Sequence, residues 1–270
     1  MSEILTERSG SILRVTLNRP ARKNAMTSGM YVTLADILND AAKDDDIRAV
    51  LWHGAGDSFT AGNDVEDFLT SPPEQGESPQ ARLMNALISF DKPLVAAVHG
   101  AAVGGGTTML THCDFVYAGE SAKFQMPFIN LGLVPEFGSS FSIPARIGHL
   151  RAAELILLGL PFDARRAEEL GLVTRVVPDQ KLLATAIETA QRLVEKPAGA
   201  LQASKRLMKR SLRGQVEQAM KDENEEFAAR VRSAEVREAF AAFLEKRRPD
   251  FTKAREAATA NQGNNIAAPA

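Results

Sequence analysis

The chain of 270 residues is 44% hydrophobic and carries 32 lysines and arginines against 34 aspartates and glutamates, for a formal net charge of −2. This length suits one large domain, or one domain with a smaller appendage, and the balanced charge provides no general field that would recruit nucleic acid or an anionic membrane surface. The sequence has one cysteine, Cys113, no stretch near the roughly 20 apolar residues of a membrane helix and no secretory signal pattern at its start. It therefore predicts a cytoplasmic protein without an internal disulfide and without nucleic-acid or membrane partners.

The first part of the chain alternates between predicted strands and predicted helices. Leu13, Val15 and Leu17 alternate with polar residues, which is the period of a half-buried strand. Thr27 is expected to cap a helix whose apolar residues recur at helical spacing as far as Ala41. Further strands are predicted at 49–52, 94–98 and 114–117, and a mobile loop with three prolines at 71–79 precedes another helix. This rhythm continues to about residue 178 and predicts an α/β architecture.

The last third of the sequence has helical periodicity only. Apolar residues recur at helical spacing from Asp179 to about Arg247. We therefore divide the chain into a core of residues 1–195, a helical region of residues 196–256 and a tail of residues 257–270, whose Ala- and Asn-rich composition predicts disorder.

Two glycine-containing loops follow predicted strands, at 58–64 and 100–106. Glycine lets a backbone turn sharply and brings N–H groups close to a ligand. If a helix begins at Thr107, the N–H groups of Gly105 and Gly106 lie at its positive end, and the two loops together can form a two-donor oxyanion hole. Each loop can equally be only a tight turn. The spacings of phosphate-binding glycine loops, of a serine-hydrolase nucleophile and of histidine metal sites do not occur, so no metal site is expected.

A third candidate lies at 131–140, where Glu136 stands among apolar residues, proline and glycines. Burial would raise the pKa of such a carboxylate and strengthen it as a base. Alternatively, Glu136 interacts with the start of a helix at Ser139, as acidic residues in first turns often do.

Taken together, these segments resemble the crotonase superfamily of enoyl-CoA hydratases and isomerases. The matching stretches follow the family's order from about residue 12 to 251: Asn18-Arg19-Pro20 with Asn24-Ala25-Met26, then Phe59-Thr60-Ala61-Gly62-Asn63-Asp64, then Lys92-Pro93 leading to His99-Gly100 and the glycine triplet, then Leu170-Gly171-Leu172-Val173 with Val176-Val177-Pro178. The first two are similar to the family patterns N-R-P-x-x-x-N-A-[LM] and F-x-A-G-x-D.

The resemblance implies a spiral of strand-strand-helix repeats, followed by helices that build homotrimers or hexamers formed as dimers of trimers. It implies an acyl-CoA substrate, with CoA as part of the thioester and no separate cofactor. The implied oxyanion donors are the N–H groups of Ala61 and Gly105. The implied CoA-binding residues are Arg22, Ala25, Gly62, Asp64, Phe243 and Lys246, of which the last two act across a subunit interface.

The resemblance also bears on the reaction. Hydratases of this family use two glutamates around one water, and the corresponding positions here hold Thr108 and Phe128. The run Pro135-Glu136-Phe137-Gly138-Ser139-Ser140 instead resembles the Δ3,Δ2-enoyl-CoA isomerases, whose single base lies in a P-E-x-x-S-S segment. We therefore predict double-bond isomerisation with Glu136 as the proton shuttle.

Two other classes of function stay open at this point. One is another crotonase reaction, such as hydrolysis, decarboxylation or hydration with Asp64 or a different acid supplying the base. The other is a non-catalytic acyl-CoA binder. Phe128 and Phe137 either form part of an apolar wall around the acyl chain or belong to the ordinary core.

Overall fold

The computed structural model of the chain describes residues 2–70, 77–254 and 256. Its centre is a six-stranded sheet in which β1 pairs antiparallel with β2 and the other neighbours are parallel. In sheet order the strands are β1 (Ile4–Ser9), β2 (Ile12–Leu17), β3 (Ala49–Gly54), β4 (Leu94–Val98), β6 (Phe115–Gly119) and β9 (Arg175–Val177). The four strands predicted from the sequence are confirmed as β2, β3, β4 and β6.

Strand β1 was not predicted, because its sequence has no apolar alternation. Only Ile4 of its six residues is buried. The strand occupies the edge of the sheet. The chain reverses direction between β1 and β2 at Gly10, which adopts a φ of 58°.

A second sheet contains three short strands in the order β5-β7-β8, namely β5 (Ala101–Val103), β7 (Lys123–Gln125) and β8 (Phe162–Asp163). Strand β4 leads into β5, and β6 leads into β7. Each of these two strand pairs therefore contributes one strand to the larger sheet and one to the smaller sheet before the next helical segment. This is the strand-strand-helix spiral that the resemblance implied.

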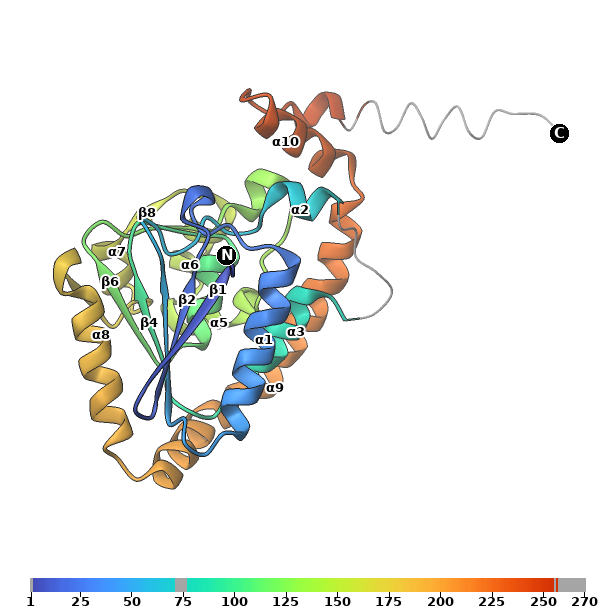
Figure 1. Ribbon diagram of the computed structural model, residues 1–270. Helices are drawn as coiled ribbons and strands as arrows, with labels where there is room; N and C mark the ends of the chain where they lie inside the picture. The colour runs from blue at the N-terminus through green and yellow to red at the C-terminus, as the bar shows by residue number, and fades with distance from the viewer. Residues whose placement is uncertain (1, 71–76, 255, 257–270) are drawn as a thin grey trace.

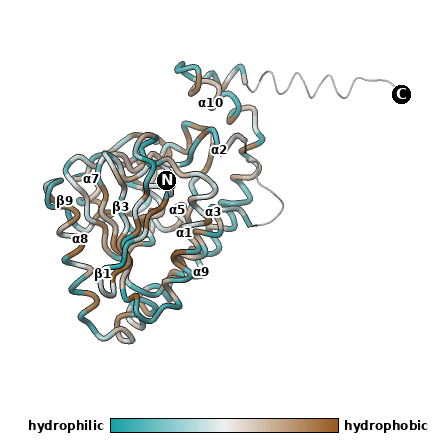
Figure 2. Tube along the Cα trace, viewed as in Figure 1, coloured by the Kyte–Doolittle hydropathy of each residue, from teal (hydrophilic) through white to brown (hydrophobic). Residues whose placement is uncertain are grey.

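Helices cover both faces of the larger sheet (Figure 1). On one face, α1 (Ser28–Lys43) packs against α3 (Pro79–Ser89), and on the other α8 (Asp179–Val194) packs on β3, β4 and β6. The predicted cap is present, because Thr27 Oγ1 accepts a hydrogen bond from the Met30 N–H at 3.2 Å. Figure 2 shows hydrophobic residues gathered on the strands between these helices.

Shorter helices connect the remaining strands. They are α2 (Val65–Thr70), α4 (Gly105–Thr108), α5 (Ser139–Ile147), α6 (His149–Leu157) and α7 (Ala164–Glu169), with 3-10 turns at η1 (Pro20–Arg22), η2 (Met109–His112) and η3 (Pro127–Leu131). None of the helices in the described part of the chain combines the length and the apolar character needed to cross a bilayer.

The C-terminal region consists of the long helix α9 (Ala198–Val231) and of α10 (Ala234–Leu244), which stands beyond the core at the end of α9 (Figure 1). Helix α9 is tied to the core, because Lys209 Nζ donates to the carbonyl oxygen of Ile88 at the end of α3 (2.7 Å). Residues 71–76 of the expected mobile loop and the expected disordered tail, residues 257–270, lie outside the described residues.

The parallel strands bring three loops to one edge of the sheet. Strand β2 leads to the turn around η1, β3 to the glycine loop at 58–64, and β4 through β5 to the second glycine loop. Because β2, β3 and β4 are parallel neighbours, their carboxyl ends lie at the same edge, where ligands of α/β sheets usually bind.

Candidate active site

The two glycine loops run directly alongside each other. The Thr60 N–H donates to the Ala101 carbonyl oxygen (2.9 Å), and the Val103 N–H donates to the Thr60 carbonyl oxygen (3.0 Å). Gly62 has a φ of 90°, and a Cβ at this position would lie 2.8 Å from the Val103 carbonyl oxygen. Glycine is therefore required for the close approach of the loops.

A cavity of about 410 Å³ opens where the loops meet. Asn63 and Gly105 lie on its wall, and most of the remaining wall is apolar. The apolar side chains include Phe128 and Leu131 of η3, Leu133, Phe227 of α9, and Phe240 and Phe243 of α10. Such a wall suits an apolar acyl chain and excludes water from part of the site.

The structure corrects one of the two predicted oxyanion donors. The Ala61 N–H donates to the Lys23 carbonyl oxygen at 2.9 Å, so this N–H group is already bonded and the prediction that it faces the ligand is wrong. The physical reason is the turn after η1, in which Lys23 and Asn24 both adopt positive φ angles, 49° and 55°. This turn brings a carbonyl oxygen against the first loop, a contact that the loop's own sequence does not reveal.

The free donors are the N–H groups of Asn63 and Gly105. Neither donates a hydrogen bond within the described residues, and both residues line the cavity. Gly105 is the first residue of α4, which begins two positions earlier than predicted, so its N–H has no partner inside the helix. Two unpaired N–H groups on the wall of one cavity are what an oxyanion hole requires.

Glu136 is the only carboxylate among the described residues that line this cavity. Its side chain is buried, and Oε1 has no hydrogen-bond partner. The carboxylate lies against the second loop, because a Cβ placed at Gly105 would be 2.7 Å from Glu136 Oε1. Burial, and secondarily the charge of Glu223, raises the pKa of Glu136 to about 8.

The alternative role for Glu136, at the start of a helix, does not hold. Helix α5 begins at Ser139 with Gly138 as its N-cap, and within the described residues Glu136 Oε1 bonds to none of the N–H groups of its first turn. The N–H groups of Gly138 and Ser140 instead donate to the carboxylate of Glu223 in α9, both at 2.7 Å. Glu136 is therefore left unpaired in the cavity.

Tyr31 is a polar residue of the site that the sequence did not reveal. Its hydroxyl donates to Asn63 Oδ1, and a Cβ at Gly105 would lie 3.2 Å from the same hydroxyl. Burial, followed by the charge of Glu136, raises the pKa of Tyr31 well above its ordinary value, so the hydroxyl keeps its proton. No motif in the sequence singles out Tyr31, which lies in the first helix among apolar residues.

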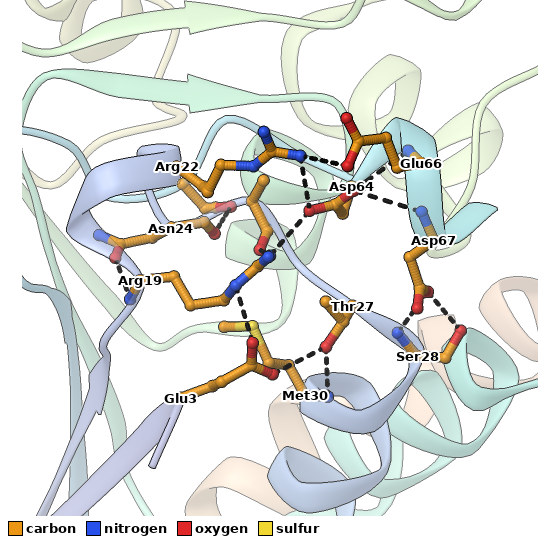
Figure 3. A network of polar contacts seen from close by, with 12 residues as sticks. Glu3, Arg19, Arg22, Asn24, Thr27, Ser28, Met30, Asp64, Glu66 and Asp67 are labelled. Carbon is orange, nitrogen blue, oxygen red and sulfur yellow. Dashed lines mark hydrogen bonds and ion pairs between the residues drawn. The ribbon is translucent and has the colours of Figure 1, made fainter. Parts of the chain in front are cut away.

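Asp64 has a structural role close to the site (Figure 3). Its carboxylate accepts a hydrogen bond from Arg19 Nη1 (2.9 Å) and from the N–H groups of Glu66 (3.1 Å) and Asp67 (3.3 Å) at the start of α2. Burial opposes ionisation, but the bonds from Arg19 and Asp67 and the charge of Arg22 hold the pKa of Asp64 below its ordinary value. Asp64 does not line the cavity, which argues against its use as a base.

Of the other predicted contact residues, Arg22 and Ala25 lie outside the lining of the cavity. Arg22 is half-exposed and pairs with Glu66 at 2.7 Å, and the Ala25 carbonyl oxygen accepts a bond from Arg19 (2.5 Å) in the same network (Figure 3). Phe243 lines the cavity, whereas Lys246 is exposed and does not.

The two positions that would hold the hydratase glutamates contain no carboxylate. Thr108 is fully buried in α4, and Phe128 lines the cavity. Phe137 is fully buried and lies outside the lining. Of the two roles left open for these phenylalanines, Phe128 therefore forms part of the cavity wall and Phe137 belongs to the core.

Comparisons with known proteins identify the family to which the chain is similar. The sequence profile of the family described as "Enoyl-CoA hydratase/isomerase" matches residues 7–254. The chain is 36% identical to the 1,2-epoxyphenylacetyl-CoA isomerase of Escherichia coli, over 93% of this chain and 99% of the relative. It is 32% identical to the 2,3-dehydroadipyl-CoA hydratase of the same organism, again over 93% and 99%. The crystal structure of an enoyl-CoA hydratase/isomerase from Pseudoalteromonas atlantica superposes with a TM-score of 0.89 at 42% identity, covering 92% of this chain and 99% of that one.

Proposed function

The chain belongs to the enoyl-CoA hydratase/isomerase family of the crotonase superfamily, and we propose that it moves the double bond of a 3-enoyl-CoA thioester to the 2-position with Glu136 as its single base. One observation carries the proposal: Glu136 is the only carboxylate among the described lining residues, and it lies against Gly105 with Oε1 unpaired. The relatives include a named isomerase and a named hydratase, so the choice between reactions rests on the residues of the cavity.

The proposed mechanism needs one proton to leave and one to return. Ionised Glu136 removes a proton from C2, between the thioester carbonyl and the double bond, and the electron pair moves onto the carbonyl oxygen to give a dienolate. The N–H groups of Asn63 and Gly105 stabilise that oxygen. The protonated Glu136 then gives the proton to C4, the C2–C3 double bond forms, and no net proton is gained or lost. The reaction requires no water, and the apolar wall beside Phe128 suits it.

The test is the variant Glu136→Gln, which has nearly the same size and cannot accept the proton. We expect conversion of 3-enoyl-CoA to 2-enoyl-CoA to fall by about 10³-fold or more, at the upper part of the range for general-base catalysis. Binding of the CoA thioester should change by less than about threefold, because the carboxylate makes no hydrogen bond that binding would break. The absorbance of the conjugated thioester measures turnover, and Glu217→Gln, a half-exposed carboxylate of α9 paired with Arg213, is the matched control.

Three other outcomes would replace the proposal. Wild-type turnover in Glu136→Gln would show that another group is the base. Formation of a 3-hydroxyacyl product from 2-enoyl-CoA by the unmodified protein would identify a hydratase. Tight thioester binding without turnover across acyl-chain lengths would identify a non-catalytic binder.

We also propose that residues 196–256 form an oligomerisation region and that the protein is a homotrimer or a dimer of trimers. Exposed leucines support an interface between copies. Within this region, Leu207 and Leu212 of α9 have 66% and 46% of their surface exposed, and Leu244 of α10 has 57%. Leu150 and Leu157 of α6, outside this region, are also exposed, at 84% and 62%. Apolar side chains at such exposure gain free energy by packing against a second chain.

A further inference from the structure

The segment that carries Glu136 has an unusual backbone. Phe137 has a φ of 64° and Gly138 a φ of 66°, so two consecutive residues are left-handed just before α5. For a phenylalanine this conformation costs free energy, and it persists only where surrounding contacts hold it. A Cβ at Gly138 would also lie 2.9 Å from Cγ1 of Val216 in α9, so the segment is pressed closely against that helix.

Glu223 of α9 holds this segment from one side. Its Oε2 accepts from the Gly138 N–H and its Oε1 from the Ser140 N–H, both at 2.7 Å. Hydrogen bonds to an ionised acceptor in this bidentate arrangement are stronger than neutral ones. Glu223 is 5% exposed, whereas most charged residues of α9 are exposed. A buried carboxylate whose hydrogen bonds, within the described part of the chain, all go to this turn indicates a specific use there.

A second contact fixes the intervening residue. His112 Nε2 lies 2.8 Å from the Phe137 carbonyl oxygen. Burial lowers the pKa of His112 to about 4, so the ring is neutral near pH 7 and donates the proton of Nε2 in this bond. The turn after Glu136 is therefore held at Phe137 by His112 and at Gly138 and Ser140 by Glu223.

We propose that Glu223 is a positioning residue for the reaction: its carboxylate clamps the turn from Gly138 to Ser140 and thereby holds the Glu136 carboxylate against Gly105. This inference rests on the proposed function, since it takes Glu136 to be the base. Glu223 also has an electrostatic effect, because its negative charge disfavours ionisation of Glu136 and makes the ionised form a stronger base.

The other charged and titratable groups around Glu136 do not replace this effect. Tyr31 of α1 keeps its proton, and His112 of η2 is neutral. Arg247 lines the same cavity and is paired with Glu238 and Glu245. Burial raises the pKa of Glu223 itself, against the lowering effect of its bonds from Ser140 and Gly138.

The test compares Glu223→Gln with Glu223→Asp. The glutamine removes the charge and turns an NH₂ group toward one of the two N–H donors, so we expect kcat to fall by about 10- to 100-fold with KM within about twofold of wild type. A base is active when ionised, so in a plot of kcat against pH the fall in kcat on the acidic side marks the pKa of Glu136. We call this fall the acidic limb. Without the neighbouring charge that pKa falls, and the limb should move to lower pH. The aspartate keeps the charge but not the reach, so kcat should fall while the limb stays in place.

Controls separate this role from a structural one. Glu217→Gln, at a half-exposed position of α9, should leave kcat and the pH profile unchanged. Wild-type kcat and profile in Glu223→Gln would overturn the inference, and so would a loss of activity that only follows the folded fraction in thermal melts. If Glu223→Gln does not fold, the fall in kcat at constant KM in Glu223→Asp decides the matter. Glu136→Gln is assayed in parallel: its inactivity beside an unaffected Glu223→Gln overturns this inference alone, whereas its activity overturns the proposed function.

Discussion

The Glu136 carboxylate occupies the space that a side chain at residue 105 would need. A Cβ there would lie 2.7 Å from Glu136 Oε1, 3.2 Å from the Tyr31 hydroxyl and 3.3 Å from Phe137 Cε2. The nearest of these atoms is the end of a side chain that can rotate, so Gly105→Ala should still fold. It should nevertheless displace the Glu136 carboxylate from Gly105 and lower kcat by about 100-fold, the loss that a misplacement of about 1 Å can cause.

Gly214→Ala is the matched control for Gly105→Ala. A Cβ at Gly214 meets nothing within 4 Å, and the residue lies inside α9. Its kcat should equal that of wild type, and its free energy of unfolding should rise by about 0.5 to 1 kcal/mol, because alanine is the better helix former. Steady-state kinetics and denaturant unfolding measure both variants. A Gly105→Ala protein with wild-type kcat would show that the position of Glu136 against residue 105 is not needed for turnover.

At the residue scale, the sequence predicted which residues meet at the cavity better than it predicted their hydrogen bonds. Glu136 and Gly105 were predicted as site residues, and the structure brings both to one cavity. The Ala61 donor failed because the availability of an N–H group depends on a carbonyl oxygen elsewhere, here that of Lys23. Glu223 could not be predicted, because it stands in the run Asp222-Glu223-Asn224-Glu225-Glu226, which looks like a solvated helix face.

At the scale of elements, long periodic segments were predictable and short paired strands were not. Helices α1 and α8 have an apolar stripe that a reader of the sequence can follow. Strands β5, β7 and β8 have only two or three residues, which is too short to show an alternation. Their pairing is set by the register of the spiral, so it appears only when the whole chain is folded.

Helix α9 is anchored near its start by a buried charge. Lys205 Nζ donates to Asp114 Oδ2 (2.7 Å) and to the Lys92 carbonyl oxygen (2.8 Å), and it lies 5.4 Å from the centroid of the Phe90 ring. Lys205→Met keeps the apolar stem and removes these bonds. The free energy of unfolding should fall by about 2 kcal/mol, because the Asp114 carboxylate and the Lys92 carbonyl oxygen then lose the charged donor that the buried Lys205 supplies.

Denaturant unfolding monitored by circular dichroism measures this effect. Lys221→Met, at an exposed position of the same helix, should change the free energy by no more than about 0.5 kcal/mol. Equal stability of the two variants would show that the Lys205 anchor adds nothing. Since α9 also carries Glu223, the same experiment should show whether a loosened start of the helix reaches the active site: kcat at low temperature, where both variants are folded, should fall only for Lys205→Met.

At the scale of the whole molecule, the cavity draws on both parts of the chain. Asn63, Gly105 and Glu136 come from the spiral, whereas Phe227, Phe240 and Phe243 come from α9 and α10. Phe243 lines the cavity and yet has 60% of its surface exposed. The wall of the site is therefore open at the C-terminal helices, and the proposed oligomer would place a second copy of the chain there.

The proposed assembly makes a definite prediction about mass. Light scattering coupled to size-exclusion chromatography should give three or six times the mass of one chain at micromolar concentration. The double variant Leu150→Asp with Leu157→Asp places two charges on the apolar face of α6 and should shift the mass toward that of one chain, because a charge is costly to bury in an interface. The pair Leu207→Asp with Met208→Asp makes the same change at exposed positions of α9, so comparison of the two tells which helix lies in the interface. A single-chain mass for the unmodified protein would refute the proposed oligomer.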